Sequence, residues 1–242
     1  MFNLNRFALS DMTLCGAALR RIGTGAGSME EVAARTVRYL YEHLLDEGGD
    51  RSCALVRFFK THPYSALTEE DRRYVRNVLG GEPASAEMKC LTLLATAGEQ
   101  PQWNSRQSSA GHRSIPLASE ELVAEAPMIA QLITQFGLKA GALLRTEPGG
   151  GLLVEAEQRT YNVFFVPDAG GSPYIPAQEQ FVVPYRIRSV IGFGGLLPTG
   201  DLFAVILFSR ATLKRETADL FKPLALNVKV SVLPFDDGRI FA

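Results

Sequence analysis

Two apolar runs near the end of the chain, separated by a short polar turn, predict a β-hairpin. Val190–Leu197 and Leu202–Ser209 are rich in β-branched and aromatic residues, and Pro198–Asp201 between them contains the proline and glycine that favour a turn. Both runs are apolar at nearly every position, so we expect the sheet to be covered on both faces or to line a cavity. The first run also contains Gly192, Gly194 and Gly195. These glycines predict a β-bulge, the alternative being a close approach of a ligand or another backbone.

Other segments have the composition of further strands. Cys53–Phe59 and Cys90–Ala97 are short apolar runs, and Tyr161–Val166 is the clearest part of a β-rich stretch that begins at Leu152. Leu138–Arg145 is also predicted to be a strand. Together with the hairpin, these segments are sufficient for a central antiparallel sheet.

Helical periodicity near the start of the chain predicts two amphipathic helices. The first is expected to begin with Ser10 as its cap, and the second with Ser28, which opens a capping box, before running to about Leu45. Gly23–Gly27 separates them. No strand precedes this glycine-rich segment, so we expect a flexible turn and not a phosphate-binding loop.

Later segments predict further helices with prolines inside them. A short helix should open at Thr68, and Ser119–Phe136 has helical spacing that Pro127 should break or restart. The chain is helical again from Thr212, and Pro223 in this segment should kink the helix at a cost of about 3 kcal/mol.

The polar segment Gly98–Arg113 shows no periodicity and is predicted to be a long loop. It contains Trp103, the only tryptophan of the chain. Long loops of this kind are often functional or mobile. Ala177–Val183 predicts a short helix, and the tail Pro234–Ala242 should be irregular.

Composition and charge exclude several classes of protein. The 242 residues are 46% hydrophobic and 21% charged, values typical of a globular protein. The net charge of -1 is spread along the chain, which argues against a nucleic-acid partner. No apolar run reaches about 18 residues and no leader precedes the first helix, so we expect a cytoplasmic protein without a membrane partner.

Catalytic and metal-binding motifs are not found in the sequence. Cys15, Cys53 and Cys90 are odd in number and widely spaced, which predicts reduced thiols and no CxxC metal site. There is no GxSxG or HExxH motif either. We therefore expect no catalytic residue and no metal site, and the identity of any cofactor stays open. A thiol-dependent reductase remains an alternative, because two of the cysteines lie on predicted strands.

Several side chains beside the predicted strands and in the polar loop could contact a small molecule. Arginine offers a planar fork of donors, and tryptophan and tyrosine offer stacking faces. An arginine inside an apolar strand needs a buried partner or a solvent-facing position. A purely structural role is the alternative for each. The candidate ligand-binding residues are Arg57, Trp103, His112, Arg113, Tyr161, Tyr185 and Arg188.

The order of predicted elements is that of an α+β domain with a central antiparallel sheet flanked by helices. Ile187–Leu233 resembles the end of a GAF domain, in which two strands joined by a glycine turn lead into a helix, here ETADLFKPLALNV. The segments MKCLTLLATAGEQPQWN and SPYIPAQEQFVVPYRIRSVIGFGGLLPTGDLFAVILFS resemble the N-terminal sensory region of bacterial multidomain signalling proteins such as sensor histidine kinases.

The resemblance implies an organisation and a function. Residues 1–27 would be an amphipathic helix and linker, 28–233 a GAF-like sensory domain and 234–242 a tail. It further implies terminal helices that pair in a homodimer, a pocket for an unidentified small molecule on the other side of the sheet, and a C-terminal effector domain. The segment Gly98–Glu157 is long for a simple GAF domain, and neither a cyclic-nucleotide motif nor a bilin-attachment cysteine is present.

An alternative to the sensory function is a GAF-like domain without a ligand. Its function would be dimerisation or the docking of a partner. A pocket packed shut by Phe164, Phe193 and Phe203 would favour this alternative.

Overall fold

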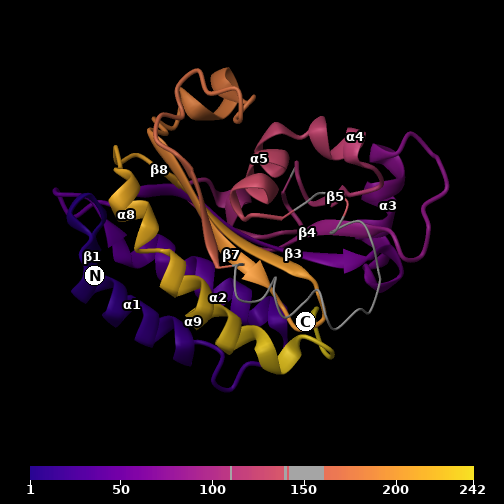
Figure 1. The fold of residues 1–242 in the computed structure, drawn as a ribbon, viewed down its shortest axis with the longest axis horizontal. Helices are drawn as coiled ribbons and strands as arrows, with labels where there is room; N and C mark the ends of the chain where they lie inside the picture. Colours follow the sequence, from indigo (N-terminus) through magenta and orange to yellow (C-terminus); the bar gives the residue numbers. More distant parts are fainter. Residues whose placement is uncertain (110, 139–140, 142–160) are drawn as a thin grey trace.

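The protein has an α+β fold built on a six-stranded antiparallel sheet, as the sequence predicts (Figure 1). This computed structural model describes residues 1–109, 111–138, 141 and 161–242. The strand order is β5-β4-β3-β8-β7-β6. The strands are β3 (Cys53–Pro63), β4 (Lys89–Gly98), β5 (Ser114–Pro116), β6 (Asn162–Val166), β7 (Ser189–Leu196) and β8 (Leu202–Ser209). A short parallel pair, β1 (Phe2–Asn3) with β2 (Leu44–Leu45), lies outside this sheet.

The predicted hairpin is confirmed as β7 and β8, but the predicted bulge is wrong. The two strands pair without a shift in register, so Gly192, Gly194 and Gly195 create no bulge. A Cβ at Gly192 would lie 3.2 Å from the ring of Phe164, and one at Gly194 would collide with the carbonyl oxygen of Phe203. The absence of a side chain therefore permits the Phe164 ring to pack closely on Gly192 and the Phe203 backbone to approach Gly194. Close approach of another backbone was the alternative to the predicted bulge.

Two helices, α2 (Met29–His43) and α9 (Lys222–Val232), lie on one face of the sheet, and α1 (Leu9–Arg21) packs on the outside of this layer (Figure 1). The predicted cap at Ser10 is wrong. The N-cap is Ala8, two residues earlier, and the Asp11 carboxylate accepts a hydrogen bond of 3.0 Å from the backbone N–H of Ala8. Ser28 caps α2 as predicted, accepting from the backbone N–H of Glu31. The helices α1 and α9 pack against each other.

Prolines begin helices in this fold. Pro127 separates α4 (Glu120–Ala124) from α5 (Pro127–Gln135), and it stands in the first turn of α5 as its geometry favours. The kink predicted at Pro223 is wrong, because a separate helix, α8 (Arg215–Asp219), ends before it and Pro223 lies in the first turn of α9. A proline there removes no intrahelical hydrogen bond.

The remaining predicted elements follow the sequence closely. Thr68 caps α3 (Glu69–Val78), and the predicted short helix after Ala177 is a single π-helical turn, η4 (Gln178–Val182). Single 3-10 turns occur at η1 (Leu4–Arg6), η2 (Tyr64–Ala66), η3 (Pro101–Asn104) and η5 (Leu233–Phe235). The strand predicted at Leu138–Arg145 and the stretch from Leu152 to residue 160 lie almost wholly outside the described residues.

The tail after η5 is irregular, as predicted, but it is tied to the start of α2. The carbonyl oxygens of Arg239 and Ile240 accept hydrogen bonds from the backbone N–H groups of Met29 and Glu30, at 3.0 and 2.8 Å. These N–H groups have no partner within the helix, so the tail supplies their acceptors.

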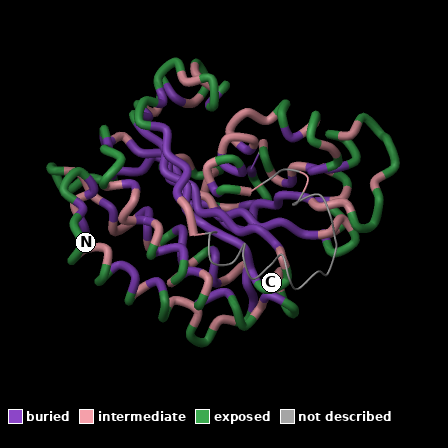
Figure 2. Tube along the Cα trace, viewed as in Figure 1, coloured by how far each residue is buried: buried purple, intermediate pink, exposed green. Residues whose placement is uncertain are grey.

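Apolar side chains fill both faces of the sheet, and the strands are buried along nearly their whole length (Figure 2). One cluster joins the sheet to α1, α2 and α9, and it also includes residues near the chain end such as Phe235 and Phe241. A second cluster joins the opposite face to α4, α5 and η4. In the described part of the chain, no helix has the length and apolar character needed to span a membrane.

Candidate functional site

A cavity of about 530 Å³ lies on the face of the sheet opposite α1, α2 and α9. Its walls come from segments far apart in sequence. Leu55 and Phe208 line it from neighbouring strands, Trp103 from the loop after β4, Ile129 from α5 and Phe181 from η4. The volume and the mostly apolar lining are those of a site for a small organic molecule.

Aromatic rings in edge contacts form one wall of the cavity. The Trp103 ring lies 5.5 Å from that of Phe181 and 4.5 Å from that of Tyr185, measured between centroids. Phe181 in turn meets Phe208 edge-on at 5.0 Å. Such edge-to-face pairs are favourable, so the rings hold one another in place and present a stable apolar surface.

Local hydrogen bonds place Trp103 at the cavity. The side chain of the next residue, Asn104, accepts from the backbone N–H of Gly98 and donates to the carbonyl oxygens of Gly98 and Gln100, at 2.9–3.2 Å. A Cβ at Gly98 would lie 2.9 Å from the indole ring, so the absence of a side chain there makes room for it. The first part of the predicted loop, Gly98–Asn104, is thus closed on the end of β4 by hydrogen bonds.

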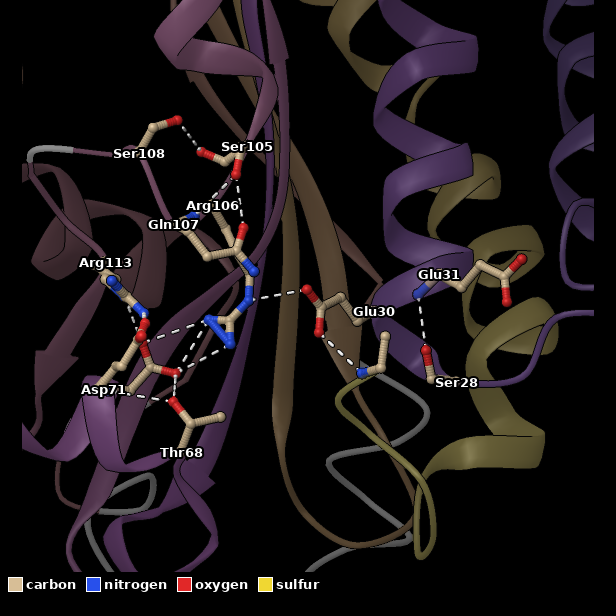
Figure 3. Close-up of polar contacts among 12 residues, drawn as sticks. Ser28, Glu30, Glu31, Thr68, Asp71, Ser105, Arg106, Gln107, Ser108 and Arg113 are labelled. Atoms are coloured by element: carbon tan, nitrogen blue, oxygen red, sulfur yellow. Dashed lines mark hydrogen bonds and ion pairs between the residues drawn. The ribbon is translucent and has the colours of Figure 1, made fainter.

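The far part of the same loop is held by a buried ionic cluster around Asp71 (Figure 3). Arg106 donates to Asp71 at 3.1 Å and to Glu30 of α2 at 3.0 Å, and Arg113 donates to the other Asp71 oxygen at 2.7 Å. Thr68 adds a hydroxyl donor at 2.7 Å. Hydrogen bonds to charged groups are the stronger kind, so this cluster fixes the loop relative to both α2 and α3.

Arg57 brings a positive charge to the cavity from the middle of β3. Its Nε atom is buried and has no hydrogen-bond partner, and a terminal nitrogen makes a long contact of 3.4 Å to the hydroxyl of Ser109. Burial lowers the pKa of Arg57 to about 10, an effect that the nearby Tyr74 opposes. The side chain therefore remains a cation at neutral pH, and no carboxylate in the described part of the chain forms an ion pair with it.

His112 lines the cavity near this arginine, in a backbone conformation with φ of 58°. Desolvation and, second, the charge of Arg57 hold the pKa of His112 below its usual range, so the imidazole is neutral at pH 7. Of the residues predicted from the sequence, the structure brings Arg57, Trp103 and His112 together as lining residues. Tyr185 supports the wall through its contact with Trp103.

The other three predicted residues lie away from the cavity. Arg113 forms ion pairs with Asp71 and Glu70. Tyr161 packs on the opposite face of the sheet, where the Lys229 amino group lies 5.6 Å from its ring centroid. Arg188 is exposed, and its backbone N–H pairs with Ser209.

Several lining residues were not predicted. Met128 and Ile129 belong to the start of α5, and Tyr174, Ile175 and Phe181 to the segment around η4. Their apolar character is ordinary for core residues and gives no sign of a cavity. The one sequence signal near these residues is the segment SPYIPAQEQF, which is part of the stretch that resembles bacterial sensory regions.

The three phenylalanines that would fill the pocket in a ligand-free GAF-like domain do not lie together. Phe193 and Phe203 belong to the apolar cluster that includes residues of α1, α2 and α9. Phe164 belongs to the cluster on the opposite face of the sheet. All of them leave the cavity open, since none lines it.

The cysteines are placed as small buried apolar residues. Cys15, Cys53 and Cys90 are unpaired and buried, and burial raises the pKa of each to about 12. A reactive thiol requires a lowered pKa and some exposure. Among the described residues there is also no group of three or more His, Cys, Asp or Glu side chains that could hold a metal ion.

No model of a known protein family matches this chain, and no curated protein matches it significantly.

Proposed function

We propose that this chain is a GAF-like sensory module of bacterial signal transduction that binds a small molecule in the cytoplasm and acts on an effector domain. The cavity beneath Trp103 is the observation that carries the proposal. It has the size of a ligand site, an apolar lining and few polar groups, among them Arg57 and His112.

The division of the molecule into two sides supports the proposal. The resemblance to GAF domains implies paired helices on one side of the sheet and a ligand pocket on the other. Here α1, α2 and α9 lie on one side of the sheet, and the cavity lies on the other side. A ligand that prefers one packing of cavity and helices would shift the population of the two packings.

A chain of contacts offers a route from the cavity to the helices. Trp103 and Arg106 belong to the same loop, and Arg106 bonds to Glu30 in the first turn of α2. Glu30 also accepts from the backbone N–H of Ala242 at 3.1 Å, which brings the end of the chain to the same point. A ligand that repositions the loop would therefore act directly on α2 and the tail.

Exposed apolar residues on α1 and α9 lead us to expect a homodimer. Leu14 and Leu226 are 63% and 43% exposed on neighbouring helices, an unfavourable arrangement in a monomer. A Leu14→Glu, Leu226→Glu variant should be a monomer where the wild type is a dimer, because a buried interface cannot accept unpaired carboxylates. Size-exclusion chromatography with light scattering measures the mass.

The matched control for this prediction is Val78→Glu, which changes an equally apolar residue, 49% exposed, at the end of α3. It should leave the oligomeric state unchanged. A monomeric wild type would contradict the proposed dimer.

Native mass spectrometry beside the same sample denatured tests ligand binding directly. We expect an added mass that is lost on denaturation. Ala126→Trp should remove this mass by filling the cavity, whereas Ala124→Trp, at an exposed position nearby that does not line the cavity, should retain it. A dimer without added mass, whose stability no small molecule alters, would favour the alternative of a dimerisation or docking module.

A further inference from the structure

The cavity contains a partly buried cationic group, Arg57, that forms no ion pair with any carboxylate of the described residues. The guanidinium of Arg57 is held inside a wall of apolar side chains, and its Nε atom has no partner. A charge removed from water without a partner is costly. Natural proteins retain such groups where a ligand supplies the partner, and a planar fork of donors fits a carboxylate.

A second unpartnered polar atom lies beside this arginine. Thr96 on β4 is directly opposite Arg57 in the strand register, so the two side chains share a face of the sheet. Its hydroxyl is buried and has no hydrogen-bond partner. The Nε atom of Arg57 and the hydroxyl of Thr96 are thus two neighbouring buried polar atoms without partners among the described residues, and of the two residues Arg57 lines the cavity.

The start of α5 adds a third favourable feature for an anion. Ala126, Pro127, Met128 and Ile129 line the cavity where this nine-residue helix begins. No side chain caps this end, and its first turn contains no acidic residue. The positive end of the helix dipole therefore faces the cavity, and the acidic residue beside it is Glu125, which precedes the N-cap Ala126.

Among the described residues that line the cavity, one is acidic. Glu125 also lines the cavity, but it is exposed to solvent and makes no ion pair with Arg57. The charge of Glu125 is therefore screened by water more strongly than that of the partly buried Arg57. The rest of the lining is mostly aromatic and aliphatic, with Trp103 and Phe181 prominent, and it also includes Gln102, His112 and Gln180.

We propose that the ligand is an aromatic or similarly apolar carboxylate, with its acid group on Arg57 and its body against Trp103. This inference rests on the proposed function and specifies the chemistry of the same cavity. The acid would accept hydrogen bonds from the guanidinium, and the ring would replace water on the apolar wall.

Matched pairs of acids and amides test the inference. Phenylacetate with phenylacetamide, and 2-naphthoate with 2-naphthamide, differ in charge but hardly in shape. Trp103 is the only tryptophan, so the quenching of its fluorescence reports occupancy of the cavity. Isothermal titration calorimetry confirms each affinity independently of optical effects.

We expect the wild type to bind each acid at least about 10-fold more tightly than its amide, since a hydrogen bond to a charged group is worth that much. Arg57→Gln should weaken the acids roughly 10- to 100-fold and leave the amides within about 3-fold. Arg57→Lys should restore part of the loss, because it keeps the charge without the fork. Arg188→Gln, which removes an exposed arginine outside the cavity, should change neither class.

Thermal unfolding separates a lost ligand contact from a failure to fold. Arg57→Gln should melt no lower than the wild type, because it removes a buried charge without a partner. A lower melting temperature together with equal losses for acids and amides would show a structural role and overturn the inference.

The remaining outcomes separate this inference from the proposed function. Equal binding of acid and amide by the wild type would overturn the carboxylate and leave a small-molecule sensor. An added mass in the native spectra of a protein that binds none of the acids would also overturn the carboxylate and keep the small-molecule sensor. No binding of the probes and no added mass would overturn both.

Discussion

An Asp201→Asn variant should lose roughly 3–5 kcal/mol of unfolding free energy, because the change breaks a buried ion pair by removing one partner. Asp201 lies in the turn between β7 and β8 and is 6% exposed. It accepts hydrogen bonds of 2.6 Å from the amino groups of both Lys60 and Lys89. The amide would leave two ammonium groups, one fully buried, without a counter-charge. Denaturation in urea measures the loss.

The control for this prediction is Asp219→Asn, which removes a carboxylate from a comparable pair of cations near the surface. Asp219 lies 3.2 Å from both Arg215 and Lys222 with its side chain 40% exposed. Pairs of this kind contribute about 0–1 kcal/mol, so this variant should unfold almost like the wild type. Equal losses for the two variants would contradict the importance of burial at Asp201.

The effect of Asp201 should depend on pH in a defined direction. Burial alone would raise the pKa of Asp201, but the charges and hydrogen bonds of Lys60 and Lys89 hold it below the usual value. A depressed pKa in the folded state contributes stability that is fully present above the unfolded pKa of about 3.9 and is lost at lower pH. The difference between wild type and Asp201→Asn should therefore be constant from pH 7 to about pH 5 and shrink below about pH 4.

Asp71→Asn should cost a similar amount, roughly 3–5 kcal/mol, because Asp71 is fully buried and pairs with two arginines. Removal of its charge leaves Arg106, which is also buried, with Glu30 as its one remaining ion-pair partner among the described residues. The adjacent Glu70→Gln is the matched control: Glu70 pairs with the same Arg113 but is 66% exposed in its side chain. It should cost no more than about 1 kcal/mol.

The same variant tests whether the ionic cluster positions the cavity wall. If the cluster fixes the loop, Asp71→Asn should also change the fluorescence of Trp103 in the folded protein, whereas Glu70→Gln should not. An unchanged Trp103 spectrum in a destabilised Asp71→Asn protein would show that the Asn104 hydrogen bonds alone hold the indole.

Elements with a clear local pattern were predictable. The hairpin follows from two apolar runs and a proline-glycine turn, and α3 from the Thr68 cap. Pro127 was correctly expected to divide a helix, because its ring acts on its own neighbours. Pro223 was not predicted correctly. The sequence shows that a helix is interrupted there, but whether it kinks or begins again depends on packing beyond the local chain.

The candidate site was only partly predictable, and adjacent residues show why. His112 and Arg113 are neighbours in a polar loop and looked equivalent, yet His112 lines the cavity while Arg113 pairs with Asp71, 42 positions away. Tyr161 looked like Tyr185, but its side chain lies on the other face of the sheet. A strand presents alternate residues to opposite faces, and which set meets the cavity is decided by pairing and not by composition.

The sequence by itself determined the α+β class, most of the regular elements and the polar side chains worth considering, because helix and strand periods, caps and prolines act over a few residues. Only the tertiary structure decided that Arg57, Trp103 and His112 meet at one cavity, and that Arg57 forms no ion pair within the part of the chain that the structure describes. These facts depend on contacts between segments separated by tens of residues, whose formation reflects the packing of the whole sheet and its helices.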